Sequence, residues 1–574
     1  MKPVLIYYQE NIFSQSGLLE PIKLPVTSIG IYEKFAKIVK QLDSQTDIPA
    51  IFIMVSLSEH TMEFLGLQMA HFIRIATQGK GIGELPIVLI SSASLEELFK
   101  LSDYASILRT PSVKLVEYSL ERVKESIEEC THYSHLNHYS EYLKKTVIPS
   151  PARHVSHHSL TGEWSLYQWS RKLGLATPID SYVENNLYFK YKSSLHTDIA
   201  APQEIKYPTL DQTKSYRILL IEDEWAKGWK ALYQKLFGHY KNVTVDCLET
   251  VDFDTADQAR LTECVQKQLS EQKYHLILLD IRLLQTDLGK NKDYSGLSLM
   301  DSIRKTNEGI QCIVVTASNK AWNLTDSLNK NAFAYITKES VEESSCTVNK
   351  LNELLEQSIQ ALKMGYFLRN IAQNRETITA ELNNHKTLFQ KAGKRERKEL
   401  AERLLEQQDI AWEMLLSYRF APKYLRYAFI SYYQMLEIFV EPDDELYIQI
   451  DRKGNILCKK KDDTNMNCSE SIHMEIDRTS KETVIRMGRP RNEKENIKKS
   501  TYSFVAGWMA ARTNPDASAF NRWKKINIPV GEFKVLYIIY DLLKPCRDSK
   551  AAAVGYSSEK EVEVCYLIGF LMIL

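Results

Sequence analysis

Strand-like and helix-like segments alternate strictly between residues 216 and 368, and this alternation limits the possible folds more than any other feature of the chain. Short apolar runs predict five strands, at 217–222, 243–249, 276–280, 312–318 and 334–337. Helical patterns fall between them, at 225–237, 256–271, 295–305 and 320–331, and a long helix begins near 346. Such alternation is typical of parallel strands joined by right-handed helical crossovers, with a helix layer on each face. The sequence therefore predicts a flavodoxin-like domain with a five-stranded parallel sheet.

The first 129 residues repeat this rhythm more faintly. Strand-like runs lie at 3–8, 50–57 and 85–92, and helix-like stretches lie at 63–76 and 114–129. We therefore expect a second α/β domain of the same kind at the N-terminus.

The remaining chain divides by composition, and 574 residues are enough for three or four domains. Residues 130–214 are rich in His, Ser, Tyr and Pro and are predicted to be a linker region, with short helices around 163–174. Residues 215–345 form the clearest domain, and 346–440 a long helical region. Residues 441–574 are predicted to be an α+β domain of unknown type, which opens with a hairpin at 445–460 and closes with helices. The hairpin turn is assigned to Gly454 and Asn455.

The composition favours a soluble protein of the cytoplasm. The 73 basic and 73 acidic residues balance, so no net charge directs the chain to nucleic acid or to a membrane surface. Nine cysteines without a CxxC pair suit reduced thiols. The first residues do not have the pattern of a signal peptide, and the apolar run at 565–574 is too short to span a bilayer.

Polar residues follow four of the five strands predicted after residue 216. Glu222 and Asp223 end the first strand, Asp280 ends the third, Thr316 lies at the end of the fourth, and Lys338 follows the fifth. In a sheet ordered 2-1-3-4-5, strands one, three and four are neighbours and their carboxyl ends converge. Three carboxylates brought together repel one another, and Mg²⁺ would remove that repulsion because it prefers oxygen ligands.

A metal ion, a hydroxyl and an ammonium around one carboxylate make a site for a transferred phosphoryl group. Mg²⁺ and Lys338 would neutralise the developing charge, and Thr316 would donate a hydrogen bond to a phosphoryl oxygen. Asp280 is then predicted to be the nucleophile, which forms an aspartyl phosphate.

Five short motifs, in order and at suitable spacing, resemble the receiver (CheY-like) domain of two-component response regulators. They are RILLIEDE, LILLDIRL, YSGLSLM with its Gly296, VVTASN and FAYITKES, and they cover residues 215–345. The resemblance implies that the phosphoryl donor is a histidine kinase or a phosphotransfer protein.

The resemblance also implies a role for each matching residue. Glu222 and Asp223 would be metal-binding acids, and Asp280 would be both a ligand and the phosphoacceptor. The backbone carbonyl of Arg282 would complete the protein ligands. Thr316 and Lys338 would contact the phosphoryl group, and Tyr335 would change rotamer together with the Thr316 hydroxyl.

The sequence departs from the receiver pattern in two places. The loop from Asp280 to Gly296 is longer than usual and lacks the proline often found near its start. Glu339 follows Lys338 in place of the usual proline. Neither change removes a chemical group, but the long loop could restrict access and change the lifetime of the phosphoryl group.

The N-terminal domain resembles a receiver that has lost its phosphoacceptor and its metal-binding acids. Gly66 and Ser91 keep the outline of the family. The positions of the chemistry are occupied by other residue types: Tyr7, Tyr8 and Gln9 for the acidic pair, Val55 or Ser56 for the phosphoacceptor, and Thr110, before Pro111, for the lysine. Such a domain can still bind partners or dimerise.

Two further patterns suggest other ligands more weakly. Six histidines near Cys130 could bind Zn²⁺, but their spacing does not stack them on one helix face, so a solvated linker is favoured. These are His132, His135, His138, His154, His157 and His158. The basic stretches 391–398 and 486–499 are mixed with Glu and are typical of solvated helix faces, so nucleic-acid binding is not indicated.

Residues 428–440 loosely resemble the core helix of HEPN domains, a helical family that contains many RNases. Its RNxxxH motif is matched only in part, by Arg491 and Asn492, with Asn496 in the histidine position. An active nuclease is therefore not expected even if the fold is similar.

The favoured prediction is a response regulator that signals through protein contacts, without enzymatic activity beyond accepting and hydrolysing its phosphoryl group. One alternative is a phosphate sink that buffers kinase output, as in some bacterial anti-phage two-component systems. Another is a receiver-gated effector with a HEPN-like nuclease at its C-terminus. An effector protein and a second copy of the chain remain open as partners.

Overall fold

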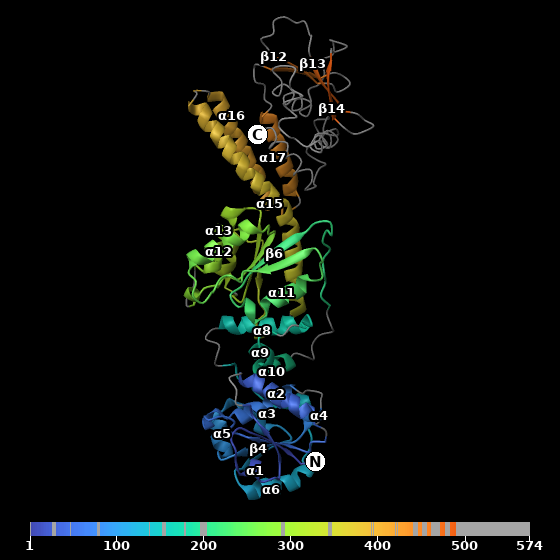
Figure 1. Cartoon of the computed structure of the whole chain (residues 1–574), viewed down its shortest axis with the longest axis vertical. Helices are drawn as coiled ribbons and strands as arrows, with labels where there is room; N and C mark the ends of the chain where they lie inside the picture. Colours follow the sequence, from blue (N-terminus) through green and yellow to red (C-terminus); the bar gives the residue numbers. More distant parts are fainter. Residues whose placement is uncertain are drawn as a thin grey trace. The chain divides into compact units, whose positions relative to one another are not determined.

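The structure is a computed structural model of the 574-residue chain (Figure 1). It describes residues 2–25, 30–45, 47–76, 81–136, 138–151, 157–176, 179–195, 204–288, 293–318, 320–342, 347–391, 393, 395–419, 421, 423–439, 446–450, 456–460, 471–476 and 483–488. The chain forms two compact units, one made of Met1–Ile303 with Gln311–Leu362, the other of Arg304–Ile310 with Lys363–Leu574.

The N-terminal domain contains a five-stranded parallel sheet in the order β2-β1-β3-β4-β5. Every residue of the three central strands is buried, as expected for a sheet covered on both faces. The strands are β1 (Val4–Tyr7), β2 (Glu20–Lys23), β3 (Ile51–Met54), β4 (Ile87–Ser91) and β5 (Val113–Glu117). The helices are α1 (Ile12–Gln15), α2 (Ile31–Asp43), α3 (Leu65–Ala76), α4 (Gly81–Glu84), α5 (Leu95–Leu101) and α6 (Leu120–Glu129).

The predicted helix at 114–129 is wrong in its first part. Val113–Glu117 is the edge strand β5, which pairs with β4, and the helix α6 begins only at Leu120. Charged residues within this segment resemble a helix pattern, but pairing with the open edge of β4 satisfies the backbone groups of an extended chain. The strand β2 and the helix α2 were not predicted either.

The linker region is largely helical where the structure describes it. Its helices are α7 (Tyr139–Lys145), α8 (His157–Lys172), α9 (Ser181–Asn185) and α10 (Leu187–Leu195). Ser181 Oγ of α9 donates a hydrogen bond to Glu33 Oε2 of α2 at 2.9 Å, α10 packs on α3, and α8 packs on α11 of the next domain. The predicted short helices around 163–174 are therefore part of a longer helix, α8.

The second parallel sheet has the order β7-β6-β8-β9-β10, which confirms the predicted order 2-1-3-4-5. The strands are β6 (Tyr216–Ile221), β7 (Val243–Cys247), β8 (Leu276–Leu279), β9 (Gln311–Thr316) and β10 (Ala334–Thr337). The helices are α11 (Trp229–Phe237), α12 (Gln258–Glu271), α13 (Ser295–Thr306) and α14 (Ala321–Asn329). Five parallel strands with intervening helices confirm the predicted flavodoxin-like fold for both domains.

Both domains place a glycine where a helix approaches the chain that leaves the third strand of the sheet. A Cβ at Gly296 would lie 2.2 Å from the backbone oxygen of Asp280, and a Cβ at Gly66 would lie 2.2 Å from that of Met54. No side chain fits at this distance. The shared close approach shows that the two domains are built alike, although their strand ends carry different residues.

The C-terminal part begins with the long helix α15 (Thr347–Lys391), followed by α16 (Arg395–Ser417) and α17 (Lys423–Phe439), which pack against each other. Two antiparallel hairpins follow, β11 (Leu446–Ile450) with β12 (Ile456–Lys460) and β13 (Ser471–Ile476) with β14 (Thr483–Gly488). The predicted hairpin at 445–460 is confirmed. Its turn, the HEPN-like positions 491, 492 and 496, and the predicted closing helices lie outside the described residues.

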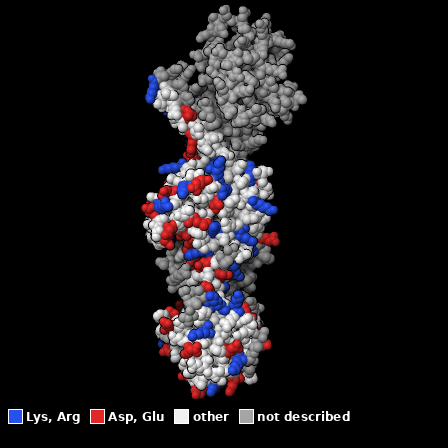
Figure 2. All heavy atoms as spheres, in the orientation of Figure 1, with Lys and Arg blue, Asp and Glu red and all other residues white. Residues whose placement is uncertain are grey.

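Charged residues of both signs are interspersed over the described residues on the face shown in Figure 2, as the balanced composition predicts. Among the described helices, none combines the length and the apolar character that a membrane crossing requires.

Candidate functional site

Three carboxylates meet at the carboxyl edge of the second sheet. Glu222 and Asp223 follow β6, and Asp280 follows β8, so the neighbouring strands bring them together. One oxygen of each lies within 4.8 Å of the others. Within the part of the chain that the structure describes, this is the only group of three or more acidic, His or Cys side chains that could hold a metal ion. Glu222 and Asp280 are buried, and Asp223 reaches solvent.

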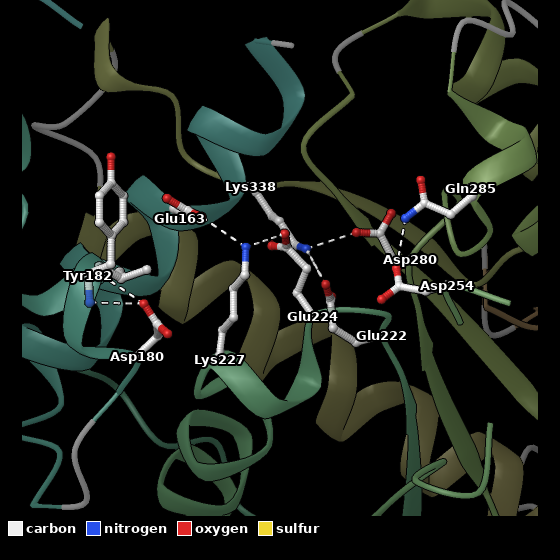
Figure 3. Close-up of polar contacts among 11 residues, drawn as sticks. Glu163, Asp180, Tyr182, Glu222, Glu224, Lys227, Asp254, Asp280, Gln285 and Lys338 are labelled. Carbon is white, nitrogen blue, oxygen red and sulfur yellow. Dashed lines mark hydrogen bonds and ion pairs between the residues drawn. The ribbon is translucent and has the colours of Figure 1, made fainter. Parts of the chain in front are cut away.

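Lys338 joins two of these carboxylates. Its Nζ donates to Asp280 Oδ2 at 2.8 Å and to Glu222 Oε2 at 2.9 Å (Figure 3). It also lies 4.4 Å from the centre of the Trp229 ring. Burial lowers the pKa of Lys338, but the carboxylates of Asp280 and Glu222 outweigh this effect and raise that pKa well above its usual value. The ammonium is therefore held charged inside the protein.

The acidic pair fits a divalent cation. Burial raises the pKa of Glu222 to about 8, against the opposing charge of Lys338 and together with the repulsion from Asp280. Asp223 reaches solvent on one side, yet the surrounding protein, Glu222 and Asp280 raise its pKa well above the usual value. Their ionised forms are destabilised mainly by burial, and repulsion among the carboxylates adds to this effect. Oxygen ligands with excess negative charge suit Mg²⁺.

Thr316 and Tyr335 are connected through Ser318. Thr316 ends β9 and is fully buried. The backbone N–H of Ser318 donates to Thr316 Oγ1 at 3.3 Å, and the Tyr335 hydroxyl donates to the Ser318 carbonyl at 2.7 Å. The predicted switch residues lie on neighbouring strands, β9 and β10, and both contact Ser318, a residue that sequence reasoning missed.

The backbone of Arg282 lies next to Asp280, since its N–H donates to Asp280 Oδ1 at 3.2 Å. The guanidinium is directed elsewhere: Nη2 donates to the Tyr294 hydroxyl at 3.0 Å. The side chain of Arg282 is therefore anchored away from the carboxylate cluster, while its backbone stays beside it.

The long loop after Asp280 is organised by a buried carboxylate that the sequence did not single out. Asp287 is fully buried and accepts hydrogen bonds from the backbone N–H groups of Leu283, Leu284 and Ser295, at 3.1 to 3.2 Å. These contacts hold the start of the loop against the beginning of α13. The described residues of the long loop therefore have defined hydrogen bonds, and they lie on one side of the acidic cluster.

A cavity of about 550 Å³ lies over the acidic cluster. The receiver-like domain contributes most of its wall, but Ser159 and Gly162 of α8 line it as well. A Cβ at Gly162 would lie 3.7 Å from Glu224 Oε2, which shows how closely α8 approaches the loop after β6. A helix of the linker region therefore forms part of this site.

Two sets of contacts attach α8 to the domain. Lys227 Nζ lies between Glu163 Oε1 of α8, at 2.9 Å, and Glu224 Oε1, at 2.6 Å (Figure 3). Glu339, the residue after Lys338, accepts from Ser165 Oγ through its backbone oxygen (2.7 Å) and from Trp169 Nε1 through its carboxylate (3.2 Å). No local sequence signal could have found these contacts, because their partners are 64 to 174 residues apart.

Trp169 extends the contact toward the lysine. Its ring meets Trp229 edge-on, with ring centres 5.8 Å apart, and Trp229 is the residue whose ring faces Lys338. Both tryptophans are fully buried. Trp169 of the linker region therefore packs against the Trp229 ring, and that ring faces the buried ammonium of Lys338.

The N-terminal domain has no comparable cluster among its described residues. Tyr7 donates to Glu10 Oε1 at 3.3 Å, and Thr110, in the lysine position, donates to the Ile107 carbonyl at 2.6 Å. The side chains of His132, His135 and His138 do not form a metal-binding group with described residues, and those of His154, His157 and His158 lie outside the description.

The comparisons with known proteins agree with this division. Residues 2–116 match the family model of the inactive receiver domain, and residues 240–348 match that of the response regulator receiver domain. The chain therefore contains an inactive receiver domain and a response-regulator receiver domain. The second match begins after Glu222 and Asp223, so their place beside Asp280 is known from the structure alone.

Several solved receiver domains are similar to part of the chain. A CheY-like receiver domain from Methanospirillum hungatei JF-1 is 24% identical over 26% of this chain and 99% of its own, with a TM-score of 0.18. The Francisella response regulator 1452 receiver domain is 18% identical over 24% of this chain and 98% of its own, with a TM-score of 0.17. A two-component response regulator from Clostridium difficile is 22% identical over 24% of this chain and 97% of its own, with a TM-score of 0.16. No curated protein matches the chain significantly.

Proposed function

We propose that the protein is a response regulator that accepts a phosphoryl group on Asp280 from a histidine kinase or a phosphotransfer protein. The observation that carries the proposal is the cluster of three carboxylates within 4.8 Å, with the ammonium of Lys338 on two of them. The cytoplasm, where such donors present their phosphohistidine, is the location we propose.

Glu222, Asp223, Asp280 and the backbone carbonyl of Arg282 are the groups that would hold Mg²⁺. The excess negative charge of the cluster and its oxygen-only ligands suit this ion. When bound, Mg²⁺ neutralises charge on the phosphoryl oxygens during transfer.

The side chains of the domain have distinct parts in the transfer. An oxygen of Asp280 attacks the phosphorus of the donor phosphohistidine, the new P–O bond forms as the P–N bond breaks, and the imidazole leaves with the bonding electrons and takes up a proton. Lys338 already contacts Asp280 and would pair with a phosphoryl oxygen. Thr316 would donate its hydroxyl hydrogen to another. Water later cleaves the acyl phosphate, and this self-dephosphorylation is the only catalytic activity that we assign.

The two other parts of the chain have supporting functions in this proposal. The N-terminal domain lacks the acidic cluster in its described residues and would act through protein contacts. The long helix α15 begins ten residues after β10 and would carry the phosphorylation signal toward the C-terminal part, for an effector protein or a second copy of the chain.

The direct test is phosphorylation of the full-length protein by acetyl phosphate and Mg²⁺, followed by peptide mass spectrometry after borohydride reduction, which traps acyl phosphates. The proposal requires the modification to map to Asp280. Modification at another residue, or none at all, would contradict it.

A further inference from the structure

A second cavity, of about 470 Å³, lies in the linker region. Its wall is made by α8, α9 and α10 together with the end of α3, and it is separate in its lining residues from the acidic cavity. Apolar residues line one part, including Ile75, Leu175 and Ile179. The polar part contains Tyr167, three serines (Ser170, Ser193 and Ser194), two cations (Arg171 and Lys190) and one carboxylate, Glu184.

Arg171 is held in the wall by neutral groups. Its Nη1 donates to the Tyr167 hydroxyl at 3.0 Å and to Ser193 Oγ at 2.8 Å. The guanidinium also lies 5.3 Å from the centre of the Tyr167 ring. These two hydrogen bonds fix the position of the guanidinium. Within the described residues Arg171 forms no ion pair, so its charge is not neutralised. Its other N–H groups remain able to donate.

Lys190 adds a second positive charge. Its Nζ lies 5.7 Å from the centre of the Phe72 ring, and it forms no ion pair within the described residues. Burial and the nearby charge of Arg171 lower the pKa of Lys190 to about 8, and Glu184 offsets this only in part. Lys190 is partly buried and Arg171 is exposed to solvent. The two cations repel each other, and a bound anion would stabilise both.

We propose that this cavity binds a small organic phosphate. The guanidinium of Arg171 and the ammonium of Lys190 would contact the phosphate oxygens, which are good acceptors for charge-assisted hydrogen bonds. Ile75, Leu175 and Ile179 would contact the rest of the molecule. The volume lies within the range of about 300–1,000 Å³ usual for small-molecule sites.

The cavity and the receiver domain share the helix α8. Tyr167, Ser170 and Arg171 line the cavity from α8, and Glu163, Ser165 and Trp169 of the same helix contact the receiver domain. A ligand in the cavity would therefore contact the helix that also forms part of the wall around the acidic cluster. Binding itself does not depend on phosphorylation of Asp280.

The test is isothermal titration calorimetry on the full-length protein in EDTA, which removes Mg²⁺ from the acidic cluster. AMP and inorganic phosphate are the probes, and adenosine is the comparison without a phosphate. We expect AMP and phosphate to bind. Adenosine should bind at least about ten-fold more weakly than AMP, because it lacks the group that the cations recognise. Equal binding of adenosine and AMP, or no binding of either phosphate compound, would overturn the proposal.

Three variants locate the binding. Lys190→Met keeps the aliphatic stem and Arg171→Gln keeps a polar side chain, and each should weaken AMP binding at least about ten-fold. Lys172→Met makes the same charge change on an exposed α8 residue that does not line the cavity, and it should leave AMP binding unchanged. Circular dichroism establishes which variants fold, and either cavity variant alone is decisive. Unchanged affinity in a folded cavity variant would show that the phosphate binds elsewhere.

Discussion

The ammonium of Lys338 lies 2.8 Å from a carboxylate oxygen of Asp280, and both side chains are buried. The same ammonium contacts Glu222 at 2.9 Å, so one buried cation is shared by two carboxylates. A buried cation of this kind is stable only while it is paired. Lys338 therefore holds the Asp280 carboxylate in place and lies beside the oxygen that, in our proposal, receives the phosphoryl group.

Replacement of Asp280 by Asn should abolish labelling by acetyl phosphate in the presence of Mg²⁺. An amide cannot form the acyl phosphate, although it has almost the same shape as the carboxylate. Asp254→Asn is the matched control, because Asp254 is an exposed acid that lines the same cavity, and it should label normally. Full labelling of Asp280→Asn would show that the phosphoacceptor is another residue. The N-terminal domain would then be one of the places to search, because its residues are unchanged in this variant.

Replacement of Asp223 by Asn should lower the affinity for Mg²⁺ by at least about ten-fold, because a charged oxygen ligand is lost. The tryptophan fluorescence of Trp225, which lines the cavity, provides the titration signal. Asp252→Asn removes an exposed acid from the same cavity and should have little effect. EDTA should stop labelling of the wild-type protein, and labelling that persists in EDTA would show that no divalent ion is needed.

Thr316→Ala should weaken the response of distant residues to phosphorylation while Asp280 remains able to accept phosphate. Thr316, Ser318 and Tyr335 form one hydrogen-bonded group, so movement of Thr316 toward a phosphoryl group should release Tyr335 to turn inward. Beryllofluoride with Mg²⁺ mimics the aspartyl phosphate. Hydrogen exchange should then change near Thr316 and Tyr335 and along residues 347–391, consistent with a coupling of about 1–3 kcal/mol.

The control for this experiment is the Asp280→Asn protein, which should show no beryllofluoride response. If exchange in the wild-type protein changes only in the loops around Asp280, the coupling through α15 is refuted. The phosphate-sink function would then explain the receiver better.

Glu163→Gln should weaken the attachment of α8 to the receiver domain by about 1 kcal/mol. The Glu163 side chain is 2% exposed and pairs with Lys227, which is partly solvent-accessible and keeps its second partner Glu224. Faster hydrogen exchange in residues 157–172 is the expected result. Lys172→Gln, on the exposed part of the same helix, should not change it. Equal protection in all three proteins would mean that the ion pair does not hold α8.

Acid should destabilise the N-terminal domain through His71. Burial lowers the pKa of His71 to about 4 from 6.5, and its ring contacts the Tyr142 hydroxyl (2.8 Å) and the Tyr104 carbonyl (3.0 Å). Between pH 6.5 and 4 the unfolded chain binds more protons, so stability is complete above pH 6.5 and decreases as the pH falls toward 4.

This loss should reach about 3 kcal/mol by pH 4, since each pKa unit corresponds to about 1.4 kcal/mol. Hydrogen exchange of residues 65–76 as a function of pH measures it. In a folded His71→Leu protein this part of the pH dependence should be absent, and a wild-type profile in that variant would show that another group titrates.

The sequence by itself determined the second parallel sheet, the three central strands of the first sheet, and the polar residues at the strand ends of the second. Buried central strands such as Leu276–Leu279 need continuous apolar runs, and their chemistry has to follow immediately, as Asp280 does. Both signals are local, because each depends on a few consecutive residues. The order of the second sheet was taken from the flavodoxin-like class of fold that the alternation predicts, and the structure confirms it.

Only the tertiary structure decided the features that depend on distant partners. Val113–Glu117 is a strand because β4 offers it an open edge, and α8 lines the acidic cavity because Glu163, Ser165 and Trp169 find partners 64 to 174 residues away. Asp287 is a buried anchor because three backbone N–H groups converge on it. The energy of these contacts depends on which surfaces the folded chain brings together, and a local pattern of residue types does not contain that information.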